Sequence, residues 1–300
     1  MWLAFHCMNL LIDILIANPK FQKQTPEFWA NVRTIGQAVG YTVRGKGTIK
    51  VPTIDDIRGK YRLLGLSPDH IFDSKDGLTQ FGETLMTYFS FRAQLLNETV
   101  EPSLMNSDEA KKLFQSLRAK LKPKCPLPMN KQKGAKKNHA FLTGIVNMLV
   151  EASIGGTSCD YDPKSLTTIT RNRMPLRTLS RRVDGAFPSV INPIAIWEIK
   201  EYYYTTTFGS RVADGVYESM LDGYELEELE MVAKRKIHHV LIVDARFTWW
   251  VKGKSYLCRI IDMLHMGLID EVLFGREVVV RVPELARKWK GELIATAANA

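Results

Sequence analysis

The chain has 300 residues, of which 45% are hydrophobic and 24% charged, and it carries a formal net charge of +9. These fractions are ordinary for a globular protein, and the length is enough to bury a sizeable core in one large domain or two modest ones. Its four cysteines have no paired spacing, which argues against a zinc site and a disulfide framework and favours a reducing, cytoplasmic setting: Cys7, Cys125, Cys159 and Cys258.

The first apolar stretch, residues 2–17, has the spacing of a helix with a broad apolar face. No Lys or Arg precedes it, three polar residues interrupt it, and it is shorter than the roughly 20 residues that a membrane span requires. We therefore expect a buried or interface helix here. We expect neither a signal peptide nor a membrane-spanning segment anywhere in the chain.

Residues up to about 105 are expected to be mainly helical. Apolar spacing predicts a helix over 26–39 with Thr25 as its N-cap, and a small hairpin over 42–51. Further helices are expected to begin at Thr53 and near Leu78. Such an arrangement resembles a winged-helix DNA-binding module, although a helical packing domain with exposed arginines fits the pattern equally. If the module reads DNA, the basic residues of the second helix are the candidates: Arg58, Lys60 and Arg62.

The positive charge is concentrated in residues 111–137, which contain ten Lys or Arg and no Asp or Glu. Removing ten charges from +9 leaves −1 for the rest of the chain. The tract suits either a phosphate-contacting surface or a solvated linker. Helical periodicity over 108–121 ends at a run of prolines, so we place a domain boundary near 122–134. The expected domains are 1–125 and 126–300.

Helices and strands alternate through the second half. Helices are expected over 138–152, 210–234, about 255–267 and 284–293, and strands over 238–244 and 278–282. This alternation predicts an α/β fold with a mixed central sheet flanked by helices. His238 and His239 are adjacent on one strand, so they face opposite sides and are expected to be structural. No glycine-rich phosphate loop appears, so a nucleotide cofactor is not expected.

Two short strands are predicted over 181–185 and 194–200, separated by a loop with two prolines. The side-chain period of two places Glu198 and Lys200 on one face, and pairing of the strands would bring Asp184 beside Glu198. Adjacent carboxylates raise each other's pKa unless a cation lies between them, and Mg²⁺ is a usual one.

Asp184 followed by Glu198-Ile199-Lys200 resembles the PD-(D/E)xK nuclease motif of type II restriction endonucleases, over roughly residues 135–285. Val183 stands where many members have Pro. The resemblance implies a restriction-endonuclease-like fold, a Mg²⁺-dependent endonuclease acting on double-stranded DNA, and a homodimer. Asp184 and Glu198 would bind the metal, and Lys200 would complete the catalytic set. Glu151 matches a further acidic ligand loosely, and a solvent-facing helix end is the alternative.

Other basic residues are candidates for contact with the DNA backbone because arginine and lysine neutralise phosphates. These candidates are Lys131, Lys133, Lys136, Lys137, Arg177, Arg181, Arg182 and Arg211. The alternative function is a DNA-binding regulator or complex subunit with a non-catalytic nuclease-like domain. That alternative explains the basic residues but leaves the acidic pair without a role.

Overall fold

The computed structural model describes residues 16–22, 24–43, 46–75, 77–132, 135–205 and 209–298, with only the backbone of 131–132, 135–137 and 211. Most of the helix expected over 2–17 lies outside these residues. Within them no helix is long and apolar enough to cross a membrane.

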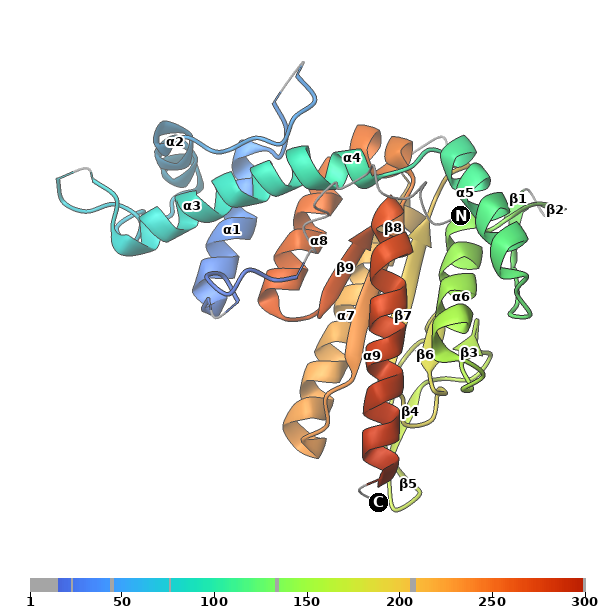
Figure 1. Ribbon diagram of the computed structural model, residues 1–300. Helices are drawn as coiled ribbons and strands as arrows, with labels where there is room; N and C mark the ends of the chain where they lie inside the picture. The colour runs from blue at the N-terminus through green and yellow to red at the C-terminus, as the bar shows by residue number, and fades with distance from the viewer. Residues whose placement is uncertain are drawn as a thin grey trace, which may run out of the picture.

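A five-stranded mixed sheet forms the centre of the molecule (Figure 1). Its order is β3-β6-β7-β8-β9, where β3 and β6 are antiparallel to their neighbours and β7, β8 and β9 run parallel. The strands are β3 (Asp160–Tyr161), β6 (Gly185–Phe187), β7 (Ala195–Glu201), β8 (His238–Asp244) and β9 (Glu271–Phe274). The expected α/β class with a mixed sheet is confirmed.

Helices cover both faces of this sheet. On one face α6 (Phe141–Ile154) and α9 (Val278–Ala298) pack against Trp197 and Ile199 of β7. On the other face lie α7 (Ser210–Ala233) and α8 (Lys254–Met266), which provide the crossovers between the parallel strands. Burial on both faces explains the continuous apolar run of β8, whereas β7 is equally buried but carries Glu198 and Lys200 on one face.

The first half is helical. It contains α1 (Pro26–Val39), α2 (Ile54–Leu64), α3 (Gln80–Gln94), a π-helical turn η1 (Leu95–Val100), α4 (Glu101–Ser103) and α5 (Ser107–Leu121). The first three enclose a core of their own, and Thr25, Thr53 and Thr79 cap them as side-chain acceptors. Of the predicted hairpin, the described residues form a single bridge between Thr42 and Ile49.

Two parts of the sequence interpretation are wrong. Residues 278–282 form the first turns of α9 instead of a strand, because Val278 and Val282 lie one turn apart and both are buried in the core beneath the helix. The strand expected over 181–185 begins only at Gly185, and residues 181–184 approach it as a loop.

Short strands also occur where none were predicted. The lysine tract contains an antiparallel hairpin, β1 (Met129–Gln132) with β2 (Ala135–His139), which delays the start of α6 to Phe141. A second hairpin pairs β4 (Thr168–Arg171) with β5 (Met174–Thr178). A six-residue η2 turn (Phe247–Lys252) and a short η3 turn (Gly275–Glu277) complete the described elements.

A buried ion pair joins the two halves of the chain. Arg92 of α3 donates two hydrogen bonds to Asp262 of α8, at 2.8 and 2.9 Å, and Tyr88 donates a third at 2.6 Å. Both charged side chains are almost fully buried, with 2% and 5% exposure. In a separate contact, Gly275 has φ +51° and a Cβ there would lie 2.1 Å from the Ser103 carbonyl oxygen, so the backbones touch only because the residue is glycine.

Candidate functional site

The hairpin of β6 and β7 positions the acidic pair. Gly185 pairs with Trp197, and the Asp184 N–H donates to the Trp197 carbonyl at 3.1 Å. The Asp184 carboxylate accepts a hydrogen bond from the Ile199 N–H at 2.7 Å. A Cβ on Gly185 would come within 2.1 Å of the Trp197 ring, so only glycine permits this approach. The expected pairing of the strands therefore brings Asp184 beside the segment that carries Glu198.

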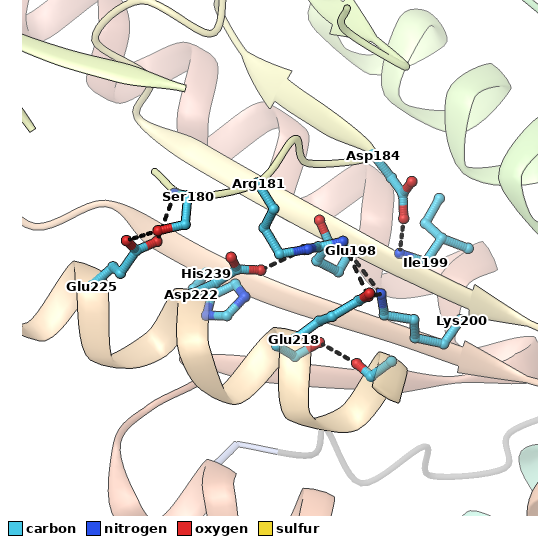
Figure 2. Close-up of polar contacts among 12 residues, drawn as sticks. Ser180, Arg181, Asp184, Glu198, Ile199, Lys200, Glu218, Asp222, Glu225 and His239 are labelled. Atoms are coloured by element: carbon cyan, nitrogen blue, oxygen red, sulfur yellow. Dashed lines mark hydrogen bonds and ion pairs between the residues drawn. The ribbon is translucent and has the colours of Figure 1, made fainter. Parts of the chain in front are cut away.

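Glu198 and Lys200 share the face of β7 that is opposite Trp197 and Ile199, and they point toward α7 (Figure 2). Glu198 is fully buried, and its Oε2 accepts from the Lys200 ammonium at 2.9 Å. Lys200 also lies 3.1 Å from Glu218 of α7. Gly215 on the same helix makes room, since a Cβ there would stand 3.2 Å from the Lys200 Cδ.

Two carboxylates of α7 belong to this cluster, and sequence reasoning missed both. Glu218 and Asp222 are four residues apart, so they lie on one face of the helix. Gly215 falls on that face as well. A glycine followed by two acids at helical spacing, directly after the strand with the motif, is the signal that would have identified them.

Arg181 lies at the centre of the carboxylates. Its guanidinium contacts Glu198 at 3.0 Å, Glu218 at 3.2 Å and Asp222 at 2.7 Å. Its neighbours Leu179 and Val183 are buried, which fixes the loop so that the arginine turns inward. Sequence reasoning expected Arg181 at the DNA backbone, whereas here its charge is engaged by acids of the protein.

The electrostatics of the cluster favour an additional cation. Four carboxylates, those of Asp184, Glu198, Glu218 and Asp222, face the two cations of Arg181 and Lys200, which leaves a formal charge of −2. Burial, followed by repulsion from Glu198, raises the pKa of Asp184 to about 6 and that of Asp222 to about 7. Burial lowers the pKa of Lys200, but the neighbouring carboxylates outweigh it and raise that pKa overall.

Three buried polar atoms in and beside the cluster have no hydrogen-bond partner among the described residues. They are Oε1 of Glu198, Oδ1 of Asp222 and Nε2 of His239. His239 of β8 is drawn beside Asp222 in Figure 2, and burial lowers its pKa so that the imidazole is neutral at physiological pH. Buried polar atoms are nearly always satisfied in native proteins, so three orphans in one place indicate an ion or water.

Asp184 stands where two depressions of the surface meet. One, of about 640 Å³, is lined by Asp162, Lys164 and the loop 180–184. The other, of about 360 Å³, is lined by Asn130 of β1 and by residues that include Lys200 and Glu218. Because Asp184 lines both, a long ligand could cross the site from one depression to the other.

A divalent metal fits the donors that are present. No group of three or more His, Cys, Asp or Glu side chains in the described part of the chain has a metal-binding arrangement. Mg²⁺ needs fewer, since it is commonly held by one or two carboxylates while water and substrate phosphates complete its shell. Asp184 and the orphaned Oε1 of Glu198 meet this requirement.

Several predicted site residues lie elsewhere. Glu151, the expected further ligand, is not part of the cluster: its carboxylate accepts from the Lys124 N–H at 3.2 and 3.0 Å. Its helix, α6, covers the opposite face of the sheet. Arg177 is held by Glu225 at 3.2 Å and Glu228 at 2.9 Å, so its charge, like that of Arg181, is engaged by acids of the protein.

The remaining basic candidates fall into three groups. Arg182 is exposed and lines the larger depression. The side chains of Lys131, Lys136, Lys137 and Arg211, and the whole of Lys133, lie outside the described residues. On α2, Arg62 is exposed, Lys60 is half-buried, and Arg58 packs over the Phe72 ring at 4.5 Å from its centroid.

Comparison with known proteins adds two family matches. No curated protein and no solved structure matches the chain. A family described as Domain of unknown function (DUF7690) matches residues 15–99, and one described as Domain of unknown function (DUF7687) matches residues 105–289. The two matches are separated between residues 99 and 105, before the domain boundary expected at 125. This division assigns α5 to the second match, together with α6, against which it packs. The match to residues 105–289 covers more than half of the chain, and the chain therefore belongs to the DUF7687 family.

Proposed function

We propose that this protein is a metal-dependent endonuclease that hydrolyses phosphodiester bonds of double-stranded DNA. The observation that carries the proposal is the meeting of Asp184, Glu198 and Lys200 at the junction of two depressions, with a buried, unpartnered oxygen on Glu198. The excess negative charge of the cluster supports a divalent cation as the cofactor.

Asp184 and Glu198 would hold Mg²⁺. A divalent ion bound there lowers the pKa of an attacking water and neutralises charge on the phosphate and the leaving oxygen. Lys200 is fixed by Glu198 and Glu218, so its ammonium is positioned to orient the water or to stabilise the negative charge that develops on the phosphate. Arg181 contacts Glu198 and Glu218 and is itself held by Asp222 of α7, so it fixes these carboxylates in place.

The surroundings of the site support a polyanionic substrate. Arg182 and Lys164 line the larger depression, and Asn130, which lines the smaller one, belongs to the β1–β2 hairpin of the lysine tract. A DNA backbone lying in the larger depression would pass Asp184 with Arg182 and Lys164 beside it, whereas the acids Glu201, Asp214 and Glu218 line the smaller depression and suit a bound cation. Two copies of the site would cut one strand each, so a homodimer is part of the proposal, as is a role in restriction.

The test is incubation of supercoiled plasmid with the full chain and Mg²⁺, with EDTA as the metal-free control. We expect nicked and linear products that EDTA abolishes. Asp184→Asn and Lys200→Met should each reduce cleavage by a factor on the order of 10² or more, because each removes a charge at the reacting phosphate. Asp162→Asn is the matched control, since Asp162 lines the same depression but pairs with exposed Lys164.

Metal binding measured by calorimetry separates the roles of the residues. Asp184→Asn should lose both Mg²⁺ binding and cleavage, whereas Lys200→Met should retain Mg²⁺ and DNA binding and lose cleavage alone. Absence of cleavage with any divalent metal, together with intact DNA binding, would instead establish the non-catalytic DNA-binding subunit.

A further inference from the structure

A second concave site lies away from the acidic cluster and is lined by residues of α1 in the first half and of α7 and α8 in the second. It has a volume of about 220 Å³. Val216, Met263 and Asp262 are buried in its floor, while Arg33, Tyr217 and Arg259 stand around it. The Glu218 and Asp222 face of α7 points to the acidic cluster, so this cavity uses a different side of the same helix.

Two guanidiniums of this cavity have no carboxylate partner among the described residues. Arg33 reaches across the opening, and its hydrogen bonds go to the sulfurs of Met266 at 3.4 Å and Met220 at 3.9 Å, which are weak acceptors. Arg259 donates to the Tyr217 hydroxyl at 2.6 Å and lies 4.7 Å from the centroid of the Tyr256 ring. Both arginines retain donors suited to an oxyanion.

Asp262 is the one acid among the described residues that line the cavity, and it does not repel an anion strongly. Asp262 already accepts two hydrogen bonds from Arg92 and one from Tyr88, so its charge is compensated within the core. With that pair neutral, Arg33 and Arg259 leave the cavity with a formal charge of +2.

An aromatic wall completes the site. Tyr41 lines the cavity and lies against Gly36 of α1, where a Cβ would stand only 3.0 Å from the tyrosine ring. Glycine in a helix interior is less favourable than alanine, and the close approach of Tyr41 accounts for it here. Tyr217 provides a second ring at the rim.

We propose that this cavity binds a nucleoside monophosphate, with its phosphate between Arg33 and Arg259 and its planar base against the tyrosines. Arginine pairs bind phosphate through several charge-assisted hydrogen bonds, and aromatic rings stack on bases. The volume is below the roughly 300–1,000 Å³ of pockets for drug-sized ligands, so part of the ligand extends through the open mouth. Because α1 and α8 belong to different family matches, the ligand would bridge the two halves.

The experiment is titration calorimetry of the full chain with AMP, inorganic phosphate and adenosine. We expect AMP to bind, phosphate to compete with it, and adenosine to bind at least ten-fold more weakly than AMP. Arg33→Gln and Arg259→Gln should each weaken AMP binding at least ten-fold. Arg287→Gln, a change of an exposed arginine on α9, is the matched control and should bind as the parent does.

Two further results decide the proposal. Asp184→Asn should bind AMP as the parent does, because that residue belongs to the other site. Arg33 is exposed on α1, so its substitution leaves the fold intact, as the melting temperature will show. No AMP binding at millimolar concentration, unchanged binding by Arg33→Gln, or loss of binding in Asp184→Asn would each overturn the proposal.

Discussion

Removing one partner of the ion pair between Arg92 and Asp262 should destabilise the protein more than breaking an ion pair on the surface. Asp262→Asn keeps the shape of the side chain and removes its charge, which leaves the Arg92 guanidinium buried at 2% exposure without a counterion. Loss of one partner of a buried pair typically costs 3–5 kcal/mol, with about 5–15 kcal/mol available to a whole domain. We therefore expect the free energy of unfolding to fall by about 3–5 kcal/mol.

Urea unfolding followed by tryptophan fluorescence and circular dichroism measures this loss as a lower midpoint with an unchanged slope. The double variant Arg92→Met/Asp262→Leu should recover most of it, because no unpaired charge remains. Asp162→Asn serves as the control, since its pair with Lys164 is 60% and 72% exposed and should change stability by less than about 1 kcal/mol. If Asp262→Asn costs as little as this control, the reasoning from burial is refuted.

Three further predictions follow from single features of the chain. Gly185→Ala should destabilise the fold by about 1–3 kcal/mol or more, seen as a lower melting temperature, because its Cβ would collide with Trp197; an unchanged melting temperature would contradict this. Burial raises the pKa of Asp244 from 3.8 to about 7, so the unfolded state releases that proton first as pH rises. Between pH 4 and pH 7 the free energy of unfolding of the parent should therefore fall by up to about 4 kcal/mol relative to that of Asp244→Asn. If the difference in urea midpoint between parent and variant is the same at both pH values, the pKa of Asp244 is not raised. The last variant replaces four lysines of the lysine tract by Gln: Lys131, Lys133, Lys136 and Lys137. The slope of log K for DNA binding against log salt concentration should become shallower by about 0.9 for each phosphate that the protein no longer neutralises. An unchanged slope would mean that the tract is a solvated linker.

Local signals predicted much of the fold. Threonine caps and apolar periodicity located α1, α2 and α3. The β-branched and aromatic residues after a proline-containing loop located β7, and a continuous apolar run located β8. The β-branched run at 278–282 was wrongly predicted to be a strand. Its strand propensity is outweighed by the free energy gained when Val278 and Val282 are buried on one face of a helix.

The candidate site was predicted only where its parts are close in sequence. Asp184, Glu198 and Lys200 share one hairpin, so alternation on a strand was enough to bring them together. The direction of Arg181 depends on acids of α7 that follow it by some forty residues, and no local pattern states where that helix packs. Glu151 was misplaced for the same reason, since the side of the sheet that α6 covers is a tertiary property.

The Arg92–Asp262 pair also sets a rule for exchanging parts of the molecule. The residues of the acidic cluster all fall in the segment 105–289, whereas Arg92 falls in the segment 15–99. A chimera that replaces the first segment thus keeps every residue of the acidic cluster. It leaves Asp262 buried without a counterion unless the new segment places a cation where Arg92 lies. Compatibility between first and second segments from different proteins should therefore be decided by this one buried charge before any surface contact matters.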